Sequence, residues 1–105
     1  MPLQVGNDAT LSTQSGYPLT AAGSAVTNAT ISAQPYKLSS GAWVVAGSAV
    51  TLSHVSAGAY SGTLQSSQID AHYSAGDRYR IVYTASSGTS DGRWVEEDTV
   101  LDRMV

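Results

Sequence analysis

Apolar and polar side chains alternate along several short stretches of this 105-residue chain, and this alternation predicts β-strands. The clearest stretch follows Gly76-Asp77, where one face is expected to carry Tyr79, Ile81 and Tyr83. The intervening side chains are expected to point the other way, because successive side chains of a strand project to opposite faces. The segment therefore predicts a strand with one buried face and one exposed face.

Further short segments predict strands in the same way. They span residues 9–13, 25–33, 43–45, 49–55 and 60–64, and a final strand starts near Arg93. Gln34-Pro35 is expected to end the second segment or to place it at a sheet edge, because proline has no N–H to donate. Residues 38–41 predict a hairpin turn, and Asp91-Gly92 is the strongest hairpin dipeptide in the chain.

No sustained helical period is present in the sequence. Only Val100, Leu101 and Met104 have the spacing to share one side of a single helical turn. Short strands with frequent turn signals are typical of an all-β sandwich or small barrel, and the length is that of one domain. We expect the strands to occupy residues 1–95, and residues 96–105 to form an acidic C-terminal strand end or tail.

The hexapeptide AGSAVT occurs at residues 22–27 and again at residues 46–51. The spacing is about that of two strands with their turns, so one interpretation is a duplicated hairpin. The other is coincidence in a chain rich in small residues, since repeat arrays usually need three or more copies. A true duplication requires both copies to begin equivalent strands.

Charged residues make up only 12% of the chain, and the formal net charge is −3. Acidic and basic residues cancel over residues 1–95, so the excess lies in residues 96–105. No basic stripe is present, which argues against direct binding to nucleic acid. The N-terminal residues lack the pattern of a signal peptide, and no apolar run is long enough to cross a membrane. Cysteine is absent, so there is no disulfide pattern that would indicate whether the protein works in an oxidising or a reducing compartment.

Residues that could carry chemistry are sparse. The only histidines, His54 and His72, match no metal-binding spacing, and no nucleophile-elbow motif accompanies them. Glu96 and Asp98 are expected to share a strand face. One interpretation is a solvated acidic strand end. The other is a calcium site, but calcium requires more converging oxygen ligands than these two carboxylates supply. We expect no enzyme activity, cofactor or metal.

Aromatic residues are the best candidates for partner contacts. Tyr60, Tyr79 and Tyr83 have the alternation of core residues. The other candidates either anchor an interface or fold back onto the ends of the domain. Those in expected loops or at a hairpin exit are Tyr17, Tyr36, Tyr73 and Trp94. A C-terminal tail that docks on a neighbouring subunit would use Val100, Leu101 and Met104 as anchors.

Three segments in order carry a family resemblance: residues 25–31, residues 52–64 with a Gly-x-Tyr-x-Gly-x-Leu pattern, and residues 75–81 with Gly-Asp-x-Tyr. They resemble immunoglobulin-like β-sandwich modules, and most closely the small accessory proteins encoded among the head and tail genes of tailed bacteriophages. The chain departs from that pattern at Ser39-Ser40-Gly41, where such modules often carry an Asp-x-x-Gly hairpin.

The resemblance implies a single immunoglobulin-like antiparallel β-sandwich of about seven short strands. It also implies a non-enzymatic structural protein of the virion, assembled in the host cytoplasm as a capsid decoration, cement or head–tail accessory. The expected partners are major capsid, connector or tail proteins and further copies of the same chain, with no membrane involved. The alternative is a bacterial extracellular immunoglobulin-like module that binds carbohydrate or protein, because such modules share the same strands.

Overall fold

The computed structural model describes residues 3–13, 20–21, 24–26, 28–56, 59–87 and 90–101. Within these ranges the chain forms one short helix, α1 (Ser66–His72), and nine strands. The strands are β1 (Ala9–Ser12), β2 (Thr20–Ala21), β3 (Ser24–Ala25), β4 (Thr30–Ser39), β5 (Ala42–Val45), β6 (Val50–Ser56), β7 (Ala59–Leu64), β8 (Arg78–Ser87) and β9 (Ser90–Thr99).

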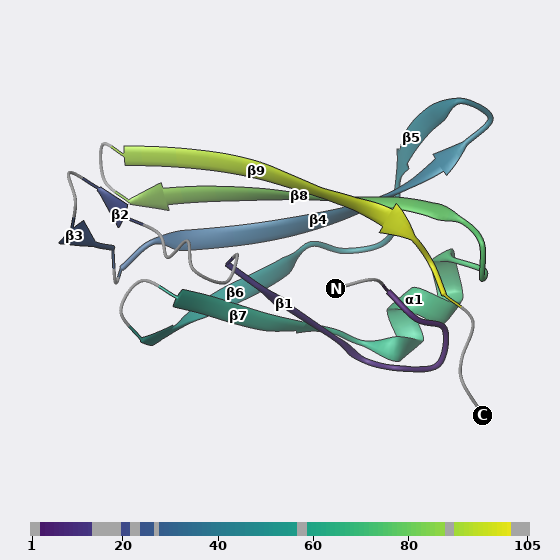
Figure 1. Ribbon diagram of the computed structural model, residues 1–105, viewed down its shortest axis with the longest axis horizontal. Coiled ribbons are helices and arrows are strands. Elements are labelled where there is room, and N and C mark those ends of the chain that lie inside the picture. Colours follow the sequence, from purple (N-terminus) through teal and green to yellow (C-terminus); the bar gives the residue numbers. More distant parts are fainter. Residues whose placement is uncertain are drawn as a thin grey trace.

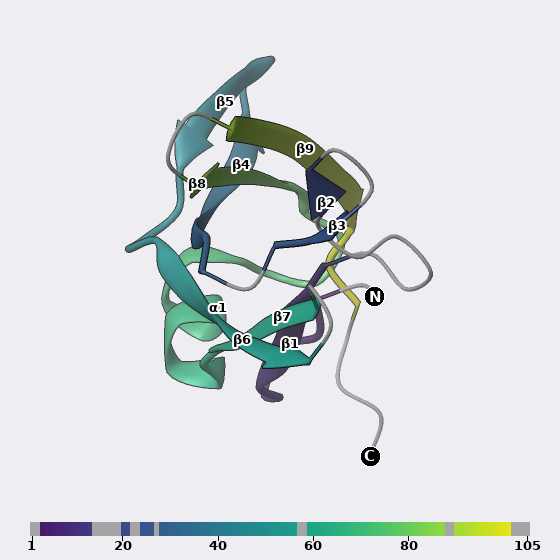
Figure 2. The ribbon, with the colours of Figure 1, turned by 90° about the vertical axis from the view of Figure 1, so that its left-hand side faces the viewer.

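Seven of these strands form one antiparallel sheet in the order β1-β7-β6-β4-β8-β9, with β5 paired to β4 as a branch; β2 and β3 form a separate small hairpin. The sheet curls so that β4, β8 and β9 face β1, β6 and β7 across the core (Figures 1 and 2). The all-β prediction is confirmed. The seven strands are continuous in one curled sheet.

β8 shows how the sequence produces the core. Tyr79, Ile81 and Tyr83 are at most 1% exposed, as their alternation predicted, while the residues between them face outward. The same buried cluster includes Ile31 of the adjacent strand β4 and Leu64 of β7 in the opposite layer. Burying an apolar side chain of this size contributes about 1.5–3 kcal/mol. This inner face therefore supplies much of the driving force for the fold.

The buried phenols all have hydrogen-bond partners. The hydroxyl of Tyr60 donates to the carbonyl of Val26 (2.7 Å) and accepts from the amide of Ala29 (3.0 Å). The hydroxyl of Tyr73 donates to the carbonyl of Tyr36 (2.7 Å). Among the described residues, no buried side-chain nitrogen or oxygen lacks a partner. The tyrosines therefore fill the core without leaving polar groups unsatisfied.

The prediction for Gln34-Pro35 is wrong, because β4 continues through Pro35 to Ser39 in the interior of the sheet. On one side of β4, β6 pairs with residues 31–33 and β5 with residues 36–39. Pro35 lies at the junction between them, where its carbonyl accepts a bond from the amide of Ala46 (3.0 Å). The junction needs no donor from residue 35, so proline is tolerated there.

The prediction of a turn at Asp91-Gly92 is also wrong. Both residues lie in β9, opposite Ser86 and Ala85 of β8, and the pairing of the two strands extends to Ser87 opposite Ser90. This register sets Trp94 opposite Tyr83 on the inner face. A shift of one residue would turn the inner residues of β9 outward, so burial decides the position of the turn.

The helix α1 was not predicted by the sequence pattern. Gln65 stands at its N-cap without a side-chain bond, and the free amide of Ser66 donates to Asp8 (2.8 Å), far away in the sequence. A second hydrogen bond joins the same two segments, because Asp70 of the helix accepts a bond from the amide of Gly6 (2.8 Å). The helix therefore depends on tertiary contacts with the N-terminal segment, which no local pattern reveals.

The predicted helical turn near the C-terminus is wrong in its described part. Val100 follows β9 directly and is 1% exposed, and Leu101 forms a parallel bridge with Gln4. Leu101 donates its amide to the carbonyl of Leu3 (2.8 Å), and its carbonyl accepts from Val5 (3.1 Å). Backbone pairing with the N-terminal segment takes the place of a helical turn.

The two AGSAVT segments occupy different places. Ser24–Ala25 form β3 of the small hairpin, whereas residues 48–49 precede β6 and the second copy enters that strand at Val50. Their described parts do not begin equivalent strands, so the duplication hypothesis fails.

Candidate functional site

The outer face of β4, β8 and β9 is the most distinctive surface of the described chain. Because inner and outer residues alternate, the register brings outward side chains into rows across the three strands. One row joins Gln34, Val82 and Val95, and the next joins Tyr36, Arg80 and Glu97. Val95 is 41% exposed.

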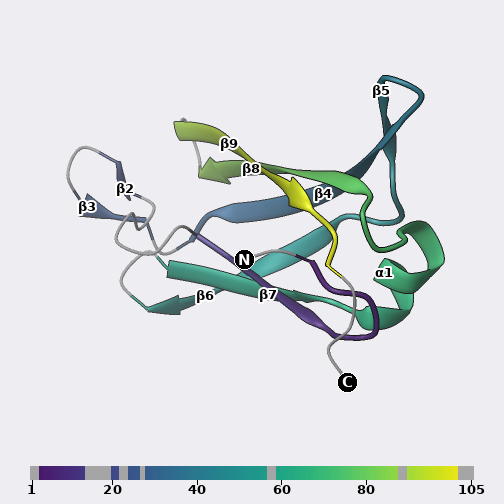
Figure 3. The same cartoon turned by 45° about the vertical axis from the view of Figure 1, so that its right-hand side comes forward.

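At one end of this face, β5 and the end of β4 leave the body as a projecting hairpin (Figures 1 and 3). We call residues 36–45 the β5 arm. Val44 is 51% exposed and Val45 is 57% exposed. They are neighbours in a strand, so they project from opposite faces of the arm. The arm therefore presents apolar surface on both faces.

Charged groups hold the β5 arm against the sheet. The Arg80 guanidinium lies over the Trp43 ring, 4.3 Å from its centroid, and Arg80 donates to Glu97 through Nη2 (2.9 Å) and Nε (3.1 Å). On the other side, Lys37 is paired with Asp77 (3.3 Å). The bond from the Ser74 amide, with further help from Lys37, lowers the pKa of Asp77. The aromatic and ionic contacts fix the direction in which the arm leaves the sheet.

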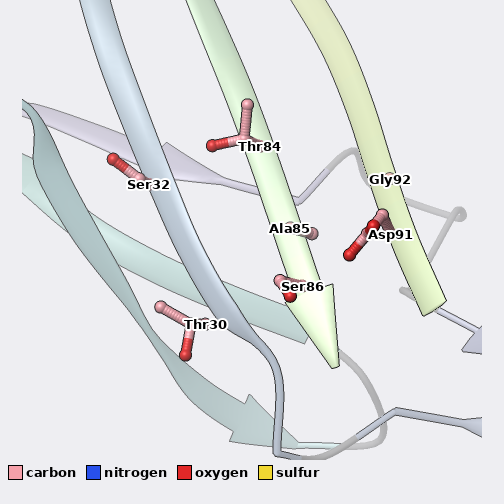
Figure 4. Close-up of a pocket in the computed structure, with 7 residues that line it drawn as sticks. All are labelled: Thr30, Ser32, Thr84, Ala85, Ser86, Asp91 and Gly92. Atoms are coloured by element: carbon pink, nitrogen blue, oxygen red, sulfur yellow. The ribbon is translucent and has the colours of Figure 1, made fainter. Parts of the chain in front are cut away.

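At the opposite end of the same face lies an open hollow of about 350 Å³. Figure 4 shows hydroxyl groups from two strands around it, with one carboxylate from β9. Its lining residues are Thr30, Ser32, Thr84, Ala85, Ser86, Asp91 and Gly92. Hydroxyls and a carboxylate in this arrangement can hydrogen-bond a polar ligand or water.

Two of the predicted contact residues belong to the core. Tyr73, which directly follows α1, is 5% exposed and packs edge-to-face with Tyr79, with 6.4 Å between the ring centroids. Burial raises the pKa of Tyr73, which keeps its hydroxyl protonated. Val100 is 1% exposed. Of the two interpretations of Tyr73, the structure shows the side chain folded back onto the domain.

The other predicted contact residues are more accessible or lie outside the described chain. Tyr36 lies in β4 and not in a loop, and it is half-buried. Trp94 is half-buried and stacks on Tyr83, with centroids 4.9 Å apart and planes inclined by 5°. Leu101 is 47% exposed. Tyr17 and Met104 lie outside the described residues.

The two histidines lie on different elements. His54 is exposed in β6 with its ring edge-on to Tyr60 (5.1 Å), and His72 is exposed at the end of α1. Of the acidic pair, Glu96 accepts a bond from the Tyr83 hydroxyl (3.2 Å), and Asp98 accepts one from the Thr99 amide (2.8 Å). Within the described ranges, no cluster of three metal-ligating side chains is found. No helix in these ranges has the length and apolar composition that crossing a bilayer requires.

Comparisons with protein-family models, curated proteins and solved structures found no match to this chain.

Sequence reasoning did not single out the β5 arm as an exposed apolar surface. It predicted a strand at residues 43–45, and this prediction is confirmed by β5. The signal was the run Trp43-Val44-Val45, which is apolar on both strand faces. Such a run fits either a strand buried on both faces or a strand that leaves the body, and only the structure separates these two cases.

Proposed function

We propose that this chain is a non-enzymatic structural protein of a tailed-bacteriophage particle, an immunoglobulin-like module that binds a capsid, connector or tail protein through the β5 arm. The observation that carries the proposal is the exposure of Val44 and Val45 on opposite faces of a projecting two-stranded arm. The sequence resemblance described above supplies the class of partner, and the two facing antiparallel layers are compatible with the immunoglobulin-like assignment.

An arm of this kind is suited to insertion between other proteins. Apolar surface on both faces remains in contact with water unless a partner covers each face. Trp43 of the arm and Arg80, which lies over its ring, are of the residue types that contribute most to protein–protein binding. The edge of β5 that no described strand pairs with can also add to a strand of the partner. A particle protein present in many copies can bind weakly at each site and still remain attached.

The first experiment measures this chain in density-purified phage particles by quantitative mass spectrometry. We expect a fixed ratio to the major shell protein. The ratio separates a many-copy decoration protein from a low-copy neck or tail component. Absence of the chain from particles, with the chain found free or on cells, would contradict the proposal.

The role of the arm is tested with matched valine substitutions. Val45→Asp and Val44→Asp introduce a charge on one face of the arm each, and Val55→Asp introduces it on β6, where Val55 is 64% exposed. Purified variants are added to particles that lack the chain, and their occupancy is measured. We expect Val45→Asp to lower the affinity at least about tenfold. The Val55→Asp control should bind like the wild type, and equal binding of all three variants would rule out the arm.

The hydroxyl-lined hollow favours a second candidate, an extracellular carbohydrate- or protein-binding module. Asp91 and four hydroxyls around a hollow of about 350 Å³ are groups that can hydrogen-bond sugar hydroxyls. The test is binding of the purified chain to a panel of glycans, with Asp91→Ala as the variant. Glycan binding that this substitution abolishes would favour the second candidate over the first.

A further inference from the structure

β9 presents the longest free edge in the sheet. It has ten residues, lies at one end of the strand order, and is paired on one side with β8 over its whole length. No described strand pairs with its other side, which forms the margin of the layer in Figure 3. Unpaired N–H and C=O groups along such an edge are a template for adding another strand.

We propose that two copies of this chain pair antiparallel along β9, about a two-fold axis at Val95. A two-fold axis perpendicular to the sheet sets the central residue opposite itself, and residues at equal distances on either side opposite each other. The outer faces of the two copies then lie on the same side and form one continuous sheet surface. This inference does not depend on the proposed function.

Among the registers centred near the middle of β9, the charges favour this one. With Val95 at the centre, Arg93 of each copy faces Glu97 of the other, and Val95 faces its own copy. The remaining pairs are Trp94 with Glu96, Gly92 with Asp98, and Asp91 with Thr99. Opposite charges directly across an antiparallel pair stabilise it, and like charges destabilise it.

The neighbouring registers all bring like charges together. Centring on Trp94 sets Asp91 opposite Glu97. Centring on Arg93, Glu96 or Glu97 sets each of these residues opposite its own copy. Among registers centred from residue 93 to residue 97, the one at Val95 alone pairs opposite charges without a like-charge pair.

The side chains concerned are available for this pairing. Arg93 is exposed and has no ion-pair partner within the described residues, and Val95 is 41% exposed. Arg80 directs both of its bonds to Oε1 of Glu97. Oε2 therefore remains to accept a bond from Arg93 of the second copy.

The experiment measures the self-association of the full chain by sedimentation equilibrium over a range of concentrations. Arg93→Glu sets two carboxylates opposite each other at positions 93 and 97, and Glu97→Arg sets two guanidinium groups there. Each variant alone therefore repels its own copy twice. We expect each to raise the dimer dissociation constant at least about tenfold. Circular dichroism checks that both variants fold.

An equal mixture of the two variants tests the register directly. The introduced glutamate of one chain then faces the introduced arginine of the other, and the unchanged Glu97 faces the unchanged Arg93. Both opposite-charge pairs are restored, so the dimer should form again. The control Arg78→Glu makes the same charge change at an exposed residue of β8 and should dimerise like the wild type.

Three results would overturn the proposal: a wild-type chain that is monomeric up to about 1 mM, a dimer unaffected by Arg93→Glu, or a mixture that does not associate. The readout is independent of particle binding. A chain that dimerises but is absent from particles supports this inference and contradicts the proposed function.

Discussion

The two faces of β8 differ sharply although their residues alternate along one strand. On the inner face, Ile81 and its tyrosine neighbours are at most 1% exposed and pack against the opposite layer. On the outer face, Arg80 and Thr84 lie among charged and hydroxyl groups next to the arm and the hollow. The inner face therefore supplies the stability of the fold, and the outer face is the surface that the folded chain presents to its surroundings.

The largest expected effect comes from removing inner-face volume. Ile81→Ala should lower the free energy of unfolding by about 2–5 kcal/mol, because it removes apolar contacts and leaves a cavity. Thr84→Ala, at an exposed position of the same strand, should change it by about 0.5 kcal/mol or less. Urea unfolding of both variants measures the difference. Equal losses would show that the two faces contribute alike.

The second-largest expected effect is a loss of stability at alkaline pH, which involves the buried tyrosines of the inner face. Burial first, and then the charge of Glu96, raise the pKa of Tyr79 and Tyr83 above the usual value of about 10. The native chain thus holds these protons more tightly than the unfolded chain, and the free energy of unfolding falls as the pH rises past about 10. The slope is at most about 1.4 kcal/mol per pH unit for each tyrosine.

Thermal unfolding as a function of pH, followed with phenolate absorbance, measures this dependence. Tyr83→Phe should make the free energy of unfolding fall less steeply with pH, because it removes the contribution of one tyrosine. A stability that stays constant from about pH 9 to 11 would contradict the prediction.

The smallest expected effect is on the outer face. Arg80 and Glu97 are paired at 2.9 Å with side chains 33% and 38% exposed, so Glu97→Gln should lower the free energy of unfolding by less than about 1 kcal/mol. High salt should remove most of the difference from the wild type, because it screens exposed charges. The control is Asp91→Asn, which removes the charge of an exposed carboxylate outside this pair. A loss above about 2 kcal/mol would mean that this pair is structural.

The sequence was most informative where one strand face is buried. The alternation of Tyr79, Ile81 and Tyr83 predicted their burial, because a period of two has only one arrangement that hides these side chains together. The strand at residues 60–64 agrees with β7 for the same reason.

Features held by distant contacts were not predictable. The α1 helix is capped by Asp8, whose place next to Ser66 depends on the path of the whole N-terminal segment. The interior position of Pro35 depends on β5 replacing β6 beside β4 at that residue. For the site, sequence analysis named Tyr73 and Val100, which are buried, and did not single out Val44 and Val45, which are exposed. Local patterns report polarity, whereas exposure follows from how strands are paired.

The backbone bonds that join Leu3 and Val5 to Leu101 have a consequence for how the protein is made. During synthesis Leu3 and Val5 leave the ribosome long before Leu101, with which their backbone groups bond in the native state. Leu3, which is fully buried in the native state, must therefore remain exposed until Leu101 has been synthesised. Closing so long a loop is entropically costly, so this pairing is expected to form late. The nascent chain is most vulnerable to aggregation in that interval, when its strand edges are open and residues 3–5 have not yet paired with Leu101.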